Sequence, residues 1–573
     1  MPVASLIRAA PGYDIARVIF PYSSEVTEAI RRIPGRAFNR TYKFWTFPLT
    51  PENVLLLRED LKRFGWALEM PPDIAAQLNA TWQKSRQAHA IRTAGDSDIA
   101  FDYLTEPYAH QRAGLAFLER LNGGALLWEM GLGKTKTAID FAEYIGGDVD
   151  NLRLVGGKPL IQFRVLVICP NTIKGNWGQE IAKHAGHDDF VIPRGTLAKR
   201  VTQLASARYT IINAEALSHK VMALALRDIV WDLIVVDEST RFKTMGAERT
   251  KALLKLQTKR RVILTGTPIT GKPQDAYVQF EWVRPGTFGN SYFVFAERYL
   301  KKDWFGNVIG LNPATADELR SRIDSVGYRL LKTDVLDLPE KVYETRTVEM
   351  TGAQLKAYRQ MRDELRIELA DNSEVRANNI LTMVLRLTQV TAGLLGQAGK
   401  YEWIPDSAKL VELRHLLNEE LANEQVVVFG LYQAELENLA NEFAPSNPAG
   451  TIGTPPIIYG PTPEGIRQTL IDEFQMGARR LLFVQSRTGG LGINLTAARN
   501  AIYYTRGWSL EEWLQSQDRL HRIGQTGTVT IIPLVAEDSI DQDIADALGA
   551  KKNMADFLTG DGARELARKI LGK

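Results

Sequence analysis

The chain has 573 residues, of which 45% are hydrophobic and 24% charged, and its net charge is only +3. This length predicts three or four globular domains at roughly 150 residues each. No stretch approaches the ~20 consecutive apolar residues of a membrane-spanning helix, and the apolar segment at the N-terminus is too short for a secretory signal. Cys169 is the only cysteine, which excludes an intrachain disulfide and a cysteine-based zinc site. We therefore expect a soluble protein of a reducing compartment.

Residues 1–70 predict a small α+β domain with a basic and aromatic segment. In RRIPGRAFNRTYKFW (31–45), five basic residues and no acidic one are interleaved with four aromatic residues. Basic side chains can neutralise phosphates and aromatic rings can stack on bases, which makes Arg36, Arg40 and Lys43 candidate DNA contacts. The alternative is a half-buried sheet with a solvated basic face. Residues 71–104 are polar and weakly helical, as expected of a linker.

Beyond residue 105, apolar runs of strand length alternate with helical stretches. Such alternation predicts parallel sheets covered by helices. The predicted units are a first lobe at 105–285, a helical insertion and interlobe region at 286–400, a second lobe at 401–545 and a helical tail at 546–573. The predicted fold class is α/β, with two tandem parallel-sheet lobes, helical insertions and a small N-terminal α+β domain.

A phosphate-binding loop is predicted in WEMGLGKTKTAIDFA (128–142), which follows a strand and runs into a helix. Gly131 and Gly133 would let backbone N–H groups turn toward phosphate oxygens at a helix N-terminus. Lys134 would reach the β- and γ-phosphates, and the Thr135 hydroxyl would bind Mg²⁺. The full consensus has glycine where this chain has Trp128, so the alternative is a glycine-rich turn with a chance lysine.

Two adjacent carboxylates end the apolar run of LIVVDEST (233–240), about 100 residues after the loop. Asp237 would hold Mg²⁺ directly or through water, and Glu238 would polarise the attacking water as general base. Either carboxylate alone could instead cap a helix. We therefore expect ATP and Mg²⁺ as cofactors, with Thr135 and Asp237 as metal ligands.

Two more segments bear on this site. RVILTGTPI (261–269) is a buried strand followed by Thr265 and Thr267, whose hydroxyls could bond the carboxylates and couple their state to the rest of the protein. The alternative is a strand that simply ends in a turn. Gln111 begins a predicted helix, and its amide could read the adenine edge.

The second lobe has no phosphate loop, but it carries LQSQDRLHRIGQTG (514–527). Arg519 and Arg522 are three residues apart on a predicted helix, so they would share one face. Presented to the γ-phosphate, they would stabilise transition-state charge as arginine fingers do. The alternative is a solvated helix face.

In their order, the motifs resemble those of the Swi/Snf family of ATP-dependent double-stranded-DNA translocases, in helicase superfamily two. The resemblance covers about 103–545, and HRIGQ (521–525) with the upstream Trp508 and Gln515 is its most diagnostic part. The other motifs are PYAHQRAGLAFL, EMGLGKTKTAI, LVICPNTIKGNW, YTIINAEAL, VVDEST, VILTGTPI, RLLKTDVLDLPEK and SRTGGLGINLTAA. The resemblance implies that both lobes are RecA-like.

The resemblance also implies roles for single residues. Gln111 corresponds to the adenine-reading glutamine, and Gly490 and Gly492 to a nucleotide-sensing loop of the second lobe. Gln515, with Thr265 and Thr267, is expected to couple ATP to movement. The motifs that usually line the DNA track contain Lys174, Asn176, Trp177, Asn213, Ser486, Arg487, Thr488 and Trp508.

IPGRAFNRTYKFWTFPL (33–49) is similar to the HARP domain of annealing helicases, enzymes that rewind or remodel branched DNA. In that branch the Asp-Glu pair is followed by serine, as it is by Ser239 here. Thr240 departs from the family by replacing the usual histidine, and WSL (508–510) replaces the common Trp-Asn-Pro.

The expected function is a DNA-dependent ATPase that translocates on double-stranded DNA and remodels or anneals forks. Its expected partner is double-stranded or branched DNA, with no membrane and with a monomer as the simplest state. One alternative is a strand-separating helicase, which would need a wedge at the fork. Another is an ATP-gated DNA clamp that displaces bound proteins. The compact form is typical of a bacterial or viral protein acting on DNA in the cytoplasm rather than in a nucleus.

Overall fold

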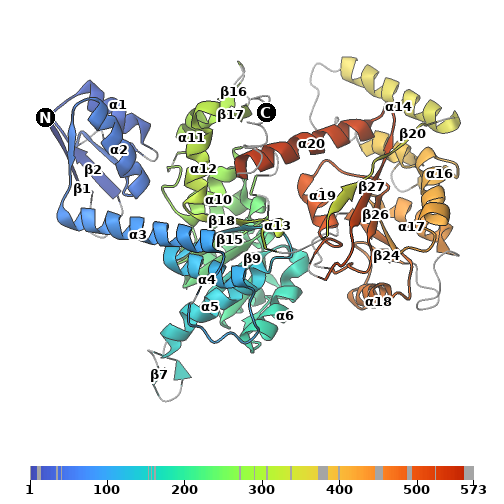
Figure 1. Cartoon of the computed structure of the whole chain (residues 1–573), viewed down its shortest axis with the longest axis horizontal. Helices are drawn as coiled ribbons and strands as arrows, with labels where there is room; N and C mark the ends of the chain where they lie inside the picture. Colours follow the sequence, from blue (N-terminus) through green and yellow to red (C-terminus); the bar gives the residue numbers. More distant parts are fainter. Residues whose placement is uncertain are drawn as a thin grey trace. The chain divides into compact units, whose positions relative to one another are not determined.

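The computed structural model shows two compact units. The first comprises residues 1–331 and the end of the described chain from Ala555, and the second comprises residues 332–554. Figure 1 traces both along the chain. None of the described helices is long and apolar enough to cross a membrane. The structure describes residues 2–9, 15–33, 36–39, 42–97, 99–151, 154–155, 158–159, 163–266, 268–269, 273–289, 291–302, 304, 308–335, 339–350, 352–371, 385–397, 400–444, 456–486, 493–522 and 524–559.

The first unit begins with a small mixed sheet of order β3-β4-β2-β1-β5. All neighbours are antiparallel except β1 and β5. Ser23 caps the first helix by accepting a hydrogen bond from Val26 N, and Thr50 caps the second, which starts with Pro51. The elements are β1 (Val3–Arg8), β2 (Ile15–Ile19), α1 (Ser24–Arg32), β3 (Ala37–Asn39), β4 (Phe44–Pro48), α2 (Pro51–Arg63) and β5 (Ala67–Glu69).

A single 23-residue helix, α3 (Pro72–Ala94), occupies most of the predicted linker. Ile74 and Leu78 at its start pack into the core of the N-terminal domain. Near its other end, Arg92 donates to the carbonyl oxygens of Asp324 and Gly327, at 3.2 and 3.1 Å. One end of the helix therefore packs on the small domain, and the other end is bonded to the first lobe (Figure 1).

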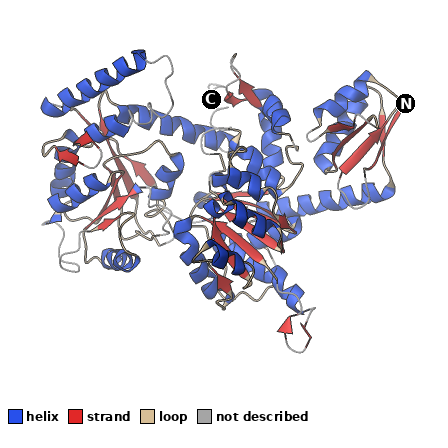
Figure 2. Cartoon of the chain, turned by 180° about the vertical axis from the view of Figure 1, so that it is seen from behind, coloured by secondary structure: helices blue, strands red, loops and turns tan. Residues whose placement is uncertain are grey.

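The first lobe is a seven-stranded sheet of order β10-β11-β9-β13-β15-β6-β18. Every pairing in it is parallel, as the alternating apolar runs predict, and Figure 2 shows the strands between helices. The strands are β6 (Gly123–Trp128), β9 (Val165–Cys169), β10 (Phe190–Val191), β11 (Tyr209–Asn213), β13 (Leu233–Asp237), β15 (Arg261–Leu264) and β18 (Gly327–Leu330). The helices are α4 (Ala109–Leu121), α5 (Lys134–Asn151), α6 (Lys174–Ala185), α7 (Leu197–Thr202), α8 (Lys220–Arg227), α9 (Glu248–Leu253), α10 (Asp275–Val283), α11 (Tyr292–Tyr299) and α12 (Ala316–Asp324).

Strand β18 lies in the 286–400 segment for which the sequence predicts a helical insertion. It pairs with β6, with Gly327 opposite Ala125 and Leu330 opposite Trp128. Because its four residues are too few to show a strand period, the sequence reads them as a continuation of the helical region.

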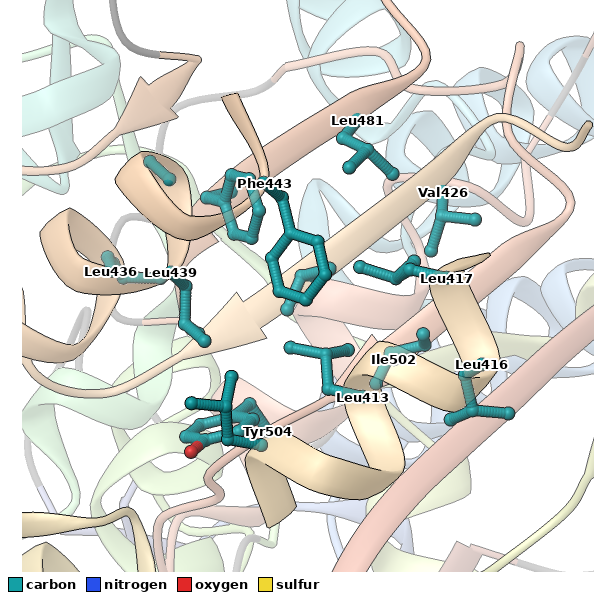
Figure 3. Close-up of a cluster of buried hydrophobic side chains, with 14 of the residues drawn as sticks. Leu413, Leu416, Leu417, Val426, Leu436, Leu439, Phe443, Leu481, Ile502 and Tyr504 are labelled. Atoms are coloured by element: carbon teal, nitrogen blue, oxygen red, sulfur yellow. The ribbon is translucent and has the colours of Figure 1, made fainter. Parts of the chain in front are cut away.

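The second unit has its own parallel sheet, of order β19-β27-β26-β23-β25-β24 with β20 also paired to β27. Figure 3 shows Leu413 and Leu417 packing beside Val426 and Phe443 in its core. The strands are β19 (Lys341–Tyr343), β20 (Arg346–Val348), β23 (Val426–Gly430), β24 (Ile457–Ile458), β25 (Leu481–Gln485), β26 (Asn500–Tyr503) and β27 (Val529–Ala536). The helices include α13 (Lys332–Val335), α14 (Gly352–Asp371), α16 (Ala408–His415), α17 (Gln433–Glu442), α18 (Glu464–Gln475), α19 (Leu510–Gln517) and α20 (Ile540–Thr559). The fold class is thus the predicted one, α/β with two parallel-sheet lobes and a small N-terminal domain.

Candidate functional site

The predicted phosphate loop connects β6 to the 18-residue helix α5, which begins at Lys134. Gly131 and Gly133 have φ angles of +85° and +78°, a conformation that favours glycine. A Cβ atom at Gly133 would collide with the side-chain amide of Gln111. Lys134 Nζ donates to the carbonyl oxygens of Trp128 and Glu129, at 2.8 and 3.2 Å. The loop therefore places the positive charge of Lys134 at a helix N-terminus, an arrangement that suits phosphate binding.

Gln111 is buried against this loop. Its Oε1 accepts from Tyr108 N at 3.0 Å, and its Nε2 donates to Leu132 O at 3.3 Å. His110, which the sequence analysis did not single out, contacts the same carbonyl through Nε2 at 2.9 Å. The Gln111 amide thus fixes the helix start to the phosphate loop, and adenine reading by Gln111 stays a prediction.

Asp237 lies at the carboxyl end of β13, which is flanked by β9 and β15. Trp177 Nε1 donates to Asp237 Oδ2 at 2.9 Å, and the N–H of Glu238 donates to Oδ1 at 3.0 Å. Burial raises the pKa of Asp237, while the hydrogen bond from Trp177 and the charge of Lys134 act in the opposite direction. The carboxylate and the phosphate-loop lysine therefore share one electrostatic environment.

Trp177 has a different place from the one that the family resemblance implies. Its side chain is only 1% exposed, and its indole N–H is used by Asp237. Direct contact with DNA is therefore disfavoured, because a buried ring cannot stack on a base or reach a phosphate. Trp177 is instead a residue that orients the candidate Mg²⁺ ligand.

Glu238 has a φ of +51°, in the left-handed region that non-glycine residues rarely adopt. It precedes the short 3₁₀ segment Ser239–Phe242. Strain of this kind persists only where surrounding structure enforces it and is often found at functional sites. Ser239, which matches the annealing-helicase branch, and Thr240, which departs from the family, are both buried in that segment.

The loop after β15 lies against the start of the phosphate loop. Thr265 is fully buried, and its N–H donates to Leu126 O at 3.2 Å. A Cβ atom at Gly266 would lie 3.2 Å from Trp128 O, so the two loops are in close contact. Thr267 lies outside the described residues, and its predicted coupling role stays a prediction.

Among the candidate DNA contacts of the first unit, Lys174 begins α6 and is half-buried, and Asn176 is exposed. Burial lowers the pKa of Lys174. Asn213 Nδ2 donates to Glu215 Oε2 at 2.8 Å. Arg36 is half-buried, Lys43 is exposed, and Arg40 is outside the described residues.

In the second unit, α19 ends at Gln517, so Arg519 and Arg522 are not on a helix as the sequence predicts. They lie in the turn that follows. Lys332 Nζ donates to Asp518 Oδ1 at 2.7 Å and to the His521 carbonyl, and these two bonds hold the turn.

Gln525, the last residue of the HRIGQ motif, also holds this turn in place. Gln525 Nε2 donates to the carbonyl oxygens of Thr496, Ala498 and Leu520, at 3.2, 2.9 and 3.2 Å. The arginine turn is therefore fastened to the segment before β26. This explains physically why glutamine ends the HRIGQ motif.

The remaining candidates of the second unit are only partly described. Ser486 is buried, Trp508 is half-buried, and Gln515 Nε2 donates to Glu511 Oε1 at 3.2 Å. Arg487, Thr488, Gly490 and Gly492 lie outside the described residues. Their predicted roles stay predictions.

The donor set of the first lobe fits a nucleotide with a hard divalent cation. It offers a hydroxyl at the start of α5 (Thr135) and a buried carboxylate (Asp237) beside a lysine and a helix N-terminus. Mg²⁺ in such sites is held by one or two protein oxygens and by the phosphates. In the described part of the chain, no group of three or more His, Cys, Asp or Glu residues could hold a metal alone.

Comparison with known proteins agrees with this geometry. The SNF2-related domain family matches residues 110–393, and the helicase conserved C-terminal domain family matches residues 408–524. Together the two matches cover more than half of the chain. The fold and the two family matches therefore define an ATPase of the helicase class. The chain is an SNF2-related ATPase with a helicase C-terminal domain.

Its relatives are distant. The chain is 25% identical over 457 residues to the uncharacterized ATP-dependent helicase MG018 of Mycoplasma genitalium, covering 78% of this chain and 41% of that protein. It is 25% identical over 482 residues to the DNA annealing helicase and endonuclease ZRANB3 of Homo sapiens, covering 80% and 41%. The chain thus spans about two fifths of the length of these relatives.

Among solved structures, the chain is similar to the SWI2/SNF2 ATPase core of Sulfolobus solfataricus in complex with double-stranded DNA. The sequence identity is 25% and the TM-score 0.39, over 82% of this chain and 99% of that one.

Proposed function

We propose that this chain is a DNA-dependent ATPase that translocates on double-stranded DNA and remodels or anneals branched DNA. The observation that carries the proposal is the Trp177–Asp237 hydrogen bond at 2.9 Å. It joins a segment that the family resemblance assigns to the DNA track with the carboxylate that serves ATP hydrolysis. Trp177 does not itself reach DNA, but it anchors to the ATP site the helix α6, which begins at the candidate DNA contact Lys174.

Each residue of the ATP site has a proposed task. Lys134 and the N-terminus of α5 bind the phosphates, Glu238 takes the proton of the attacking water, and Gln111 orients the base. Thr135 and Asp237 hold Mg²⁺, which when bound neutralises charge on the phosphates. Arg519 and Arg522 supply positive charge to the transition state.

The N-terminal domain is the proposed reader of branched DNA. Tyr42 and Phe38 are 73% and 44% exposed, the Tyr42 and Phe44 rings stack at 6.3 Å, and Arg17 lies over the Phe44 ring at 4.1 Å. Exposed rings beside cations suit unpaired bases and phosphates. Because α3 packs on this domain and bonds to the first lobe, a junction bound here would be connected to the first lobe through one continuous helix.

The name of ZRANB3 describes a DNA annealing helicase, which supports annealing as the outcome. A bacterial relative supports the expectation of a bacterial or viral protein that acts in the cytoplasm. The similarity of the N-terminal segment to the HARP domain belongs to the same proposal.

The proposal is tested by two displacement assays on the same protein. A translocase strips a triplex-forming third strand from duplex DNA in an ATP-dependent reaction but leaves a blunt duplex paired. Displacement of duplex strands would instead identify the strand-separating helicase. If neither substrate is displaced while ATP still changes the lifetime of the DNA complex, the clamp is the correct alternative.

A further inference from the structure

A buried glutamine, Gln279 of α10, connects the two segments that flank the hydrolysis site. The hydroxyl of Ser239 donates to Gln279 Oε1 at 2.5 Å. Gln279 Nε2 donates to the carbonyl oxygens of Pro268 and Asp275, both at 2.7 Å. Ser239 directly follows Glu238, and Pro268 belongs to the loop after β15 that packs on the phosphate loop.

The chemistry of the three partners specifies an amide at this position. The two carbonyl oxygens can only accept hydrogen bonds, so both N–H groups of Gln279 must face them, and its oxygen is left for the Ser239 hydroxyl. Gln279 and Ser239 are 2% and 1% exposed, so water cannot replace a missing partner. A carboxylate here would repel the carbonyls, and an apolar side chain would remove one donor from each of them.

The link acts on a strained backbone. Glu238 is in the left-handed conformation at φ +51°, and the residue after it is held by Gln279. Lys243 Nζ lies 3.5 Å from Asp275 Oδ2, which ties the end of the same 3₁₀ segment to α10. The segment that directly follows Glu238 is thus fastened to α10 at both of its ends.

We propose that Gln279 is a positioning residue for ATP hydrolysis, holding the Glu238 turn in register with the loop after β15. Ser239 is its partner, which gives the serine of the Asp-Glu-Ser sequence a physical task. The proposal rests on the ATPase activity alone and does not depend on the proposed DNA substrate.

The test compares Gln279→Met, Ser239→Ala and the double variant with wild type, in the full chain. Methionine keeps the volume of glutamine but removes all three hydrogen bonds. We expect Gln279→Met and Ser239→Ala each to lower kcat by about tenfold, with the KM for ATP and the Kd of a fluorescent ADP analogue changed by less than about threefold. Because both act through one bond, the double variant should lose little more than either single one. Ser239→Thr, which keeps the hydroxyl, should retain most of the activity.

Gln354→Met is the matched control. Gln354 is also buried, donates to the carbonyl oxygens of Val390 and Thr391, and accepts from Ala408 N, but it belongs to the second unit, whereas the phosphate loop and Asp237 belong to the first. Gln354→Met should lower the thermal midpoint and leave kcat within about twofold. The proposal is overturned if Gln279→Met lowers kcat no more than Gln354→Met, if the losses of the two single variants add, or if ADP binding falls in parallel with kcat.

All variants are assayed with and without duplex DNA. Lack of DNA stimulation in wild type would contradict the proposed function, whereas the comparison of basal kcat would still decide the role of Gln279. If Gln279→Met does not fold, Ser239→Ala and Ser239→Thr, which differ from wild type by single small groups, give the same decision.

Discussion

Trp177 and Asp237 lie 60 residues apart in the chain, yet the indole Nε1 of the first donates a 2.9 Å hydrogen bond to Oδ2 of the second. The bond runs from α6 to the end of β13 and is shielded from water. It uses one lone pair of the carboxylate and leaves the other oxygen toward the backbone of Glu238. A tryptophan in this motif therefore orients the carboxylate that the phosphate loop faces.

Removal of this donor should weaken the cation site. In Trp177→Phe we expect the Mg²⁺ concentration for half-maximal ATPase activity to rise by about 10- to 100-fold, as for other residues that orient metal ligands. Trp231→Phe is the control, because Trp231 is also buried and donates its Nε1 to Leu226 O at 3.2 Å. Equal Mg²⁺ dependence in the two variants would show that Trp177 contributes only packing.

The ion pair of Lys332 and Asp518 should stabilise the second unit. Lys332 is 2% exposed, so Lys332→Met leaves the buried Asp518 carboxylate with only the 3.6 Å ion pair to Lys341, which costs at most about 3–5 kcal/mol. Thermal unfolding should show the loss, and Lys332→Met combined with Asp518→Asn should recover part of it. Similar midpoints for wild type and the single variant would refute this.

The same pair has a defined pH dependence. Burial acts to raise the pKa of Asp518, but Lys332 and Lys341 outweigh it and hold the pKa below its usual value. The stabilisation is therefore present above the unfolded-state pKa of about 3.9 and is lost as the pH falls through the lower folded-state value. Wild type and Lys332→Met should converge in stability only under strongly acidic conditions.

The contribution of Glu435 to stability should have the opposite pH dependence. Burial raises the pKa of this carboxyl to about 7, although Thr505 Oγ1 and Leu431 N donate to its Oε1 at 2.6 and 2.9 Å. A raised pKa stabilises the fold below the unfolded value of about 4.3, and this contribution is lost as the pH rises through about 7.

Glu435→Gln keeps the accepting oxygen and removes the titration. Its thermal midpoint relative to wild type should therefore increase between pH 5 and pH 8, by the equivalent of about 1.4 kcal/mol per pH unit at most. A difference that does not change with pH would contradict the raised pKa.

The proposed DNA contacts of the N-terminal domain predict a salt effect. Lys43→Ala and Arg36→Ala should each weaken fork binding for all sequences alike and reduce the slope of log K against log salt by about 0.9. Arg63→Ala, which removes an exposed arginine from α2, should leave the slope unchanged. Point variants are preferable to deletion of 1–70, because deletion would expose Ile74 and Leu78, which pack on this domain.

The parts of the site that depend on neighbouring residues could be predicted from the sequence. Gly133 and Lys134 are set by a strand, a turn and a helix that follow one another, and Asp237 by the end of a buried strand. The parallel sheets follow from the alternating pattern in the same way. These are the features for which local sequence and final structure agree.

Contacts across the fold could not be predicted. Nothing near Asp518 shows that Lys332, 186 residues earlier, binds the turn that carries Arg519. Gln279 has one available signal, as an uncharged polar residue in the mostly apolar stretch DAYVQFEWV, but its partners Ser239 and Pro268 come from separate loops. Trp177 was assigned to DNA because its motif has that role in the family, whereas its burial became visible only in the fold.

The most direct test of the account is the steady-state ATPase rate of the full chain with no DNA and with single-stranded, blunt duplex and forked DNA. Glu238→Gln, which should bind ATP without hydrolysing it, gives the background. The account predicts that duplex DNA stimulates turnover, that forked DNA stimulates it at least as strongly, and that single-stranded DNA has little effect. The same rate with and without DNA would contradict the central claim that ATP hydrolysis in this chain is coupled to duplex DNA.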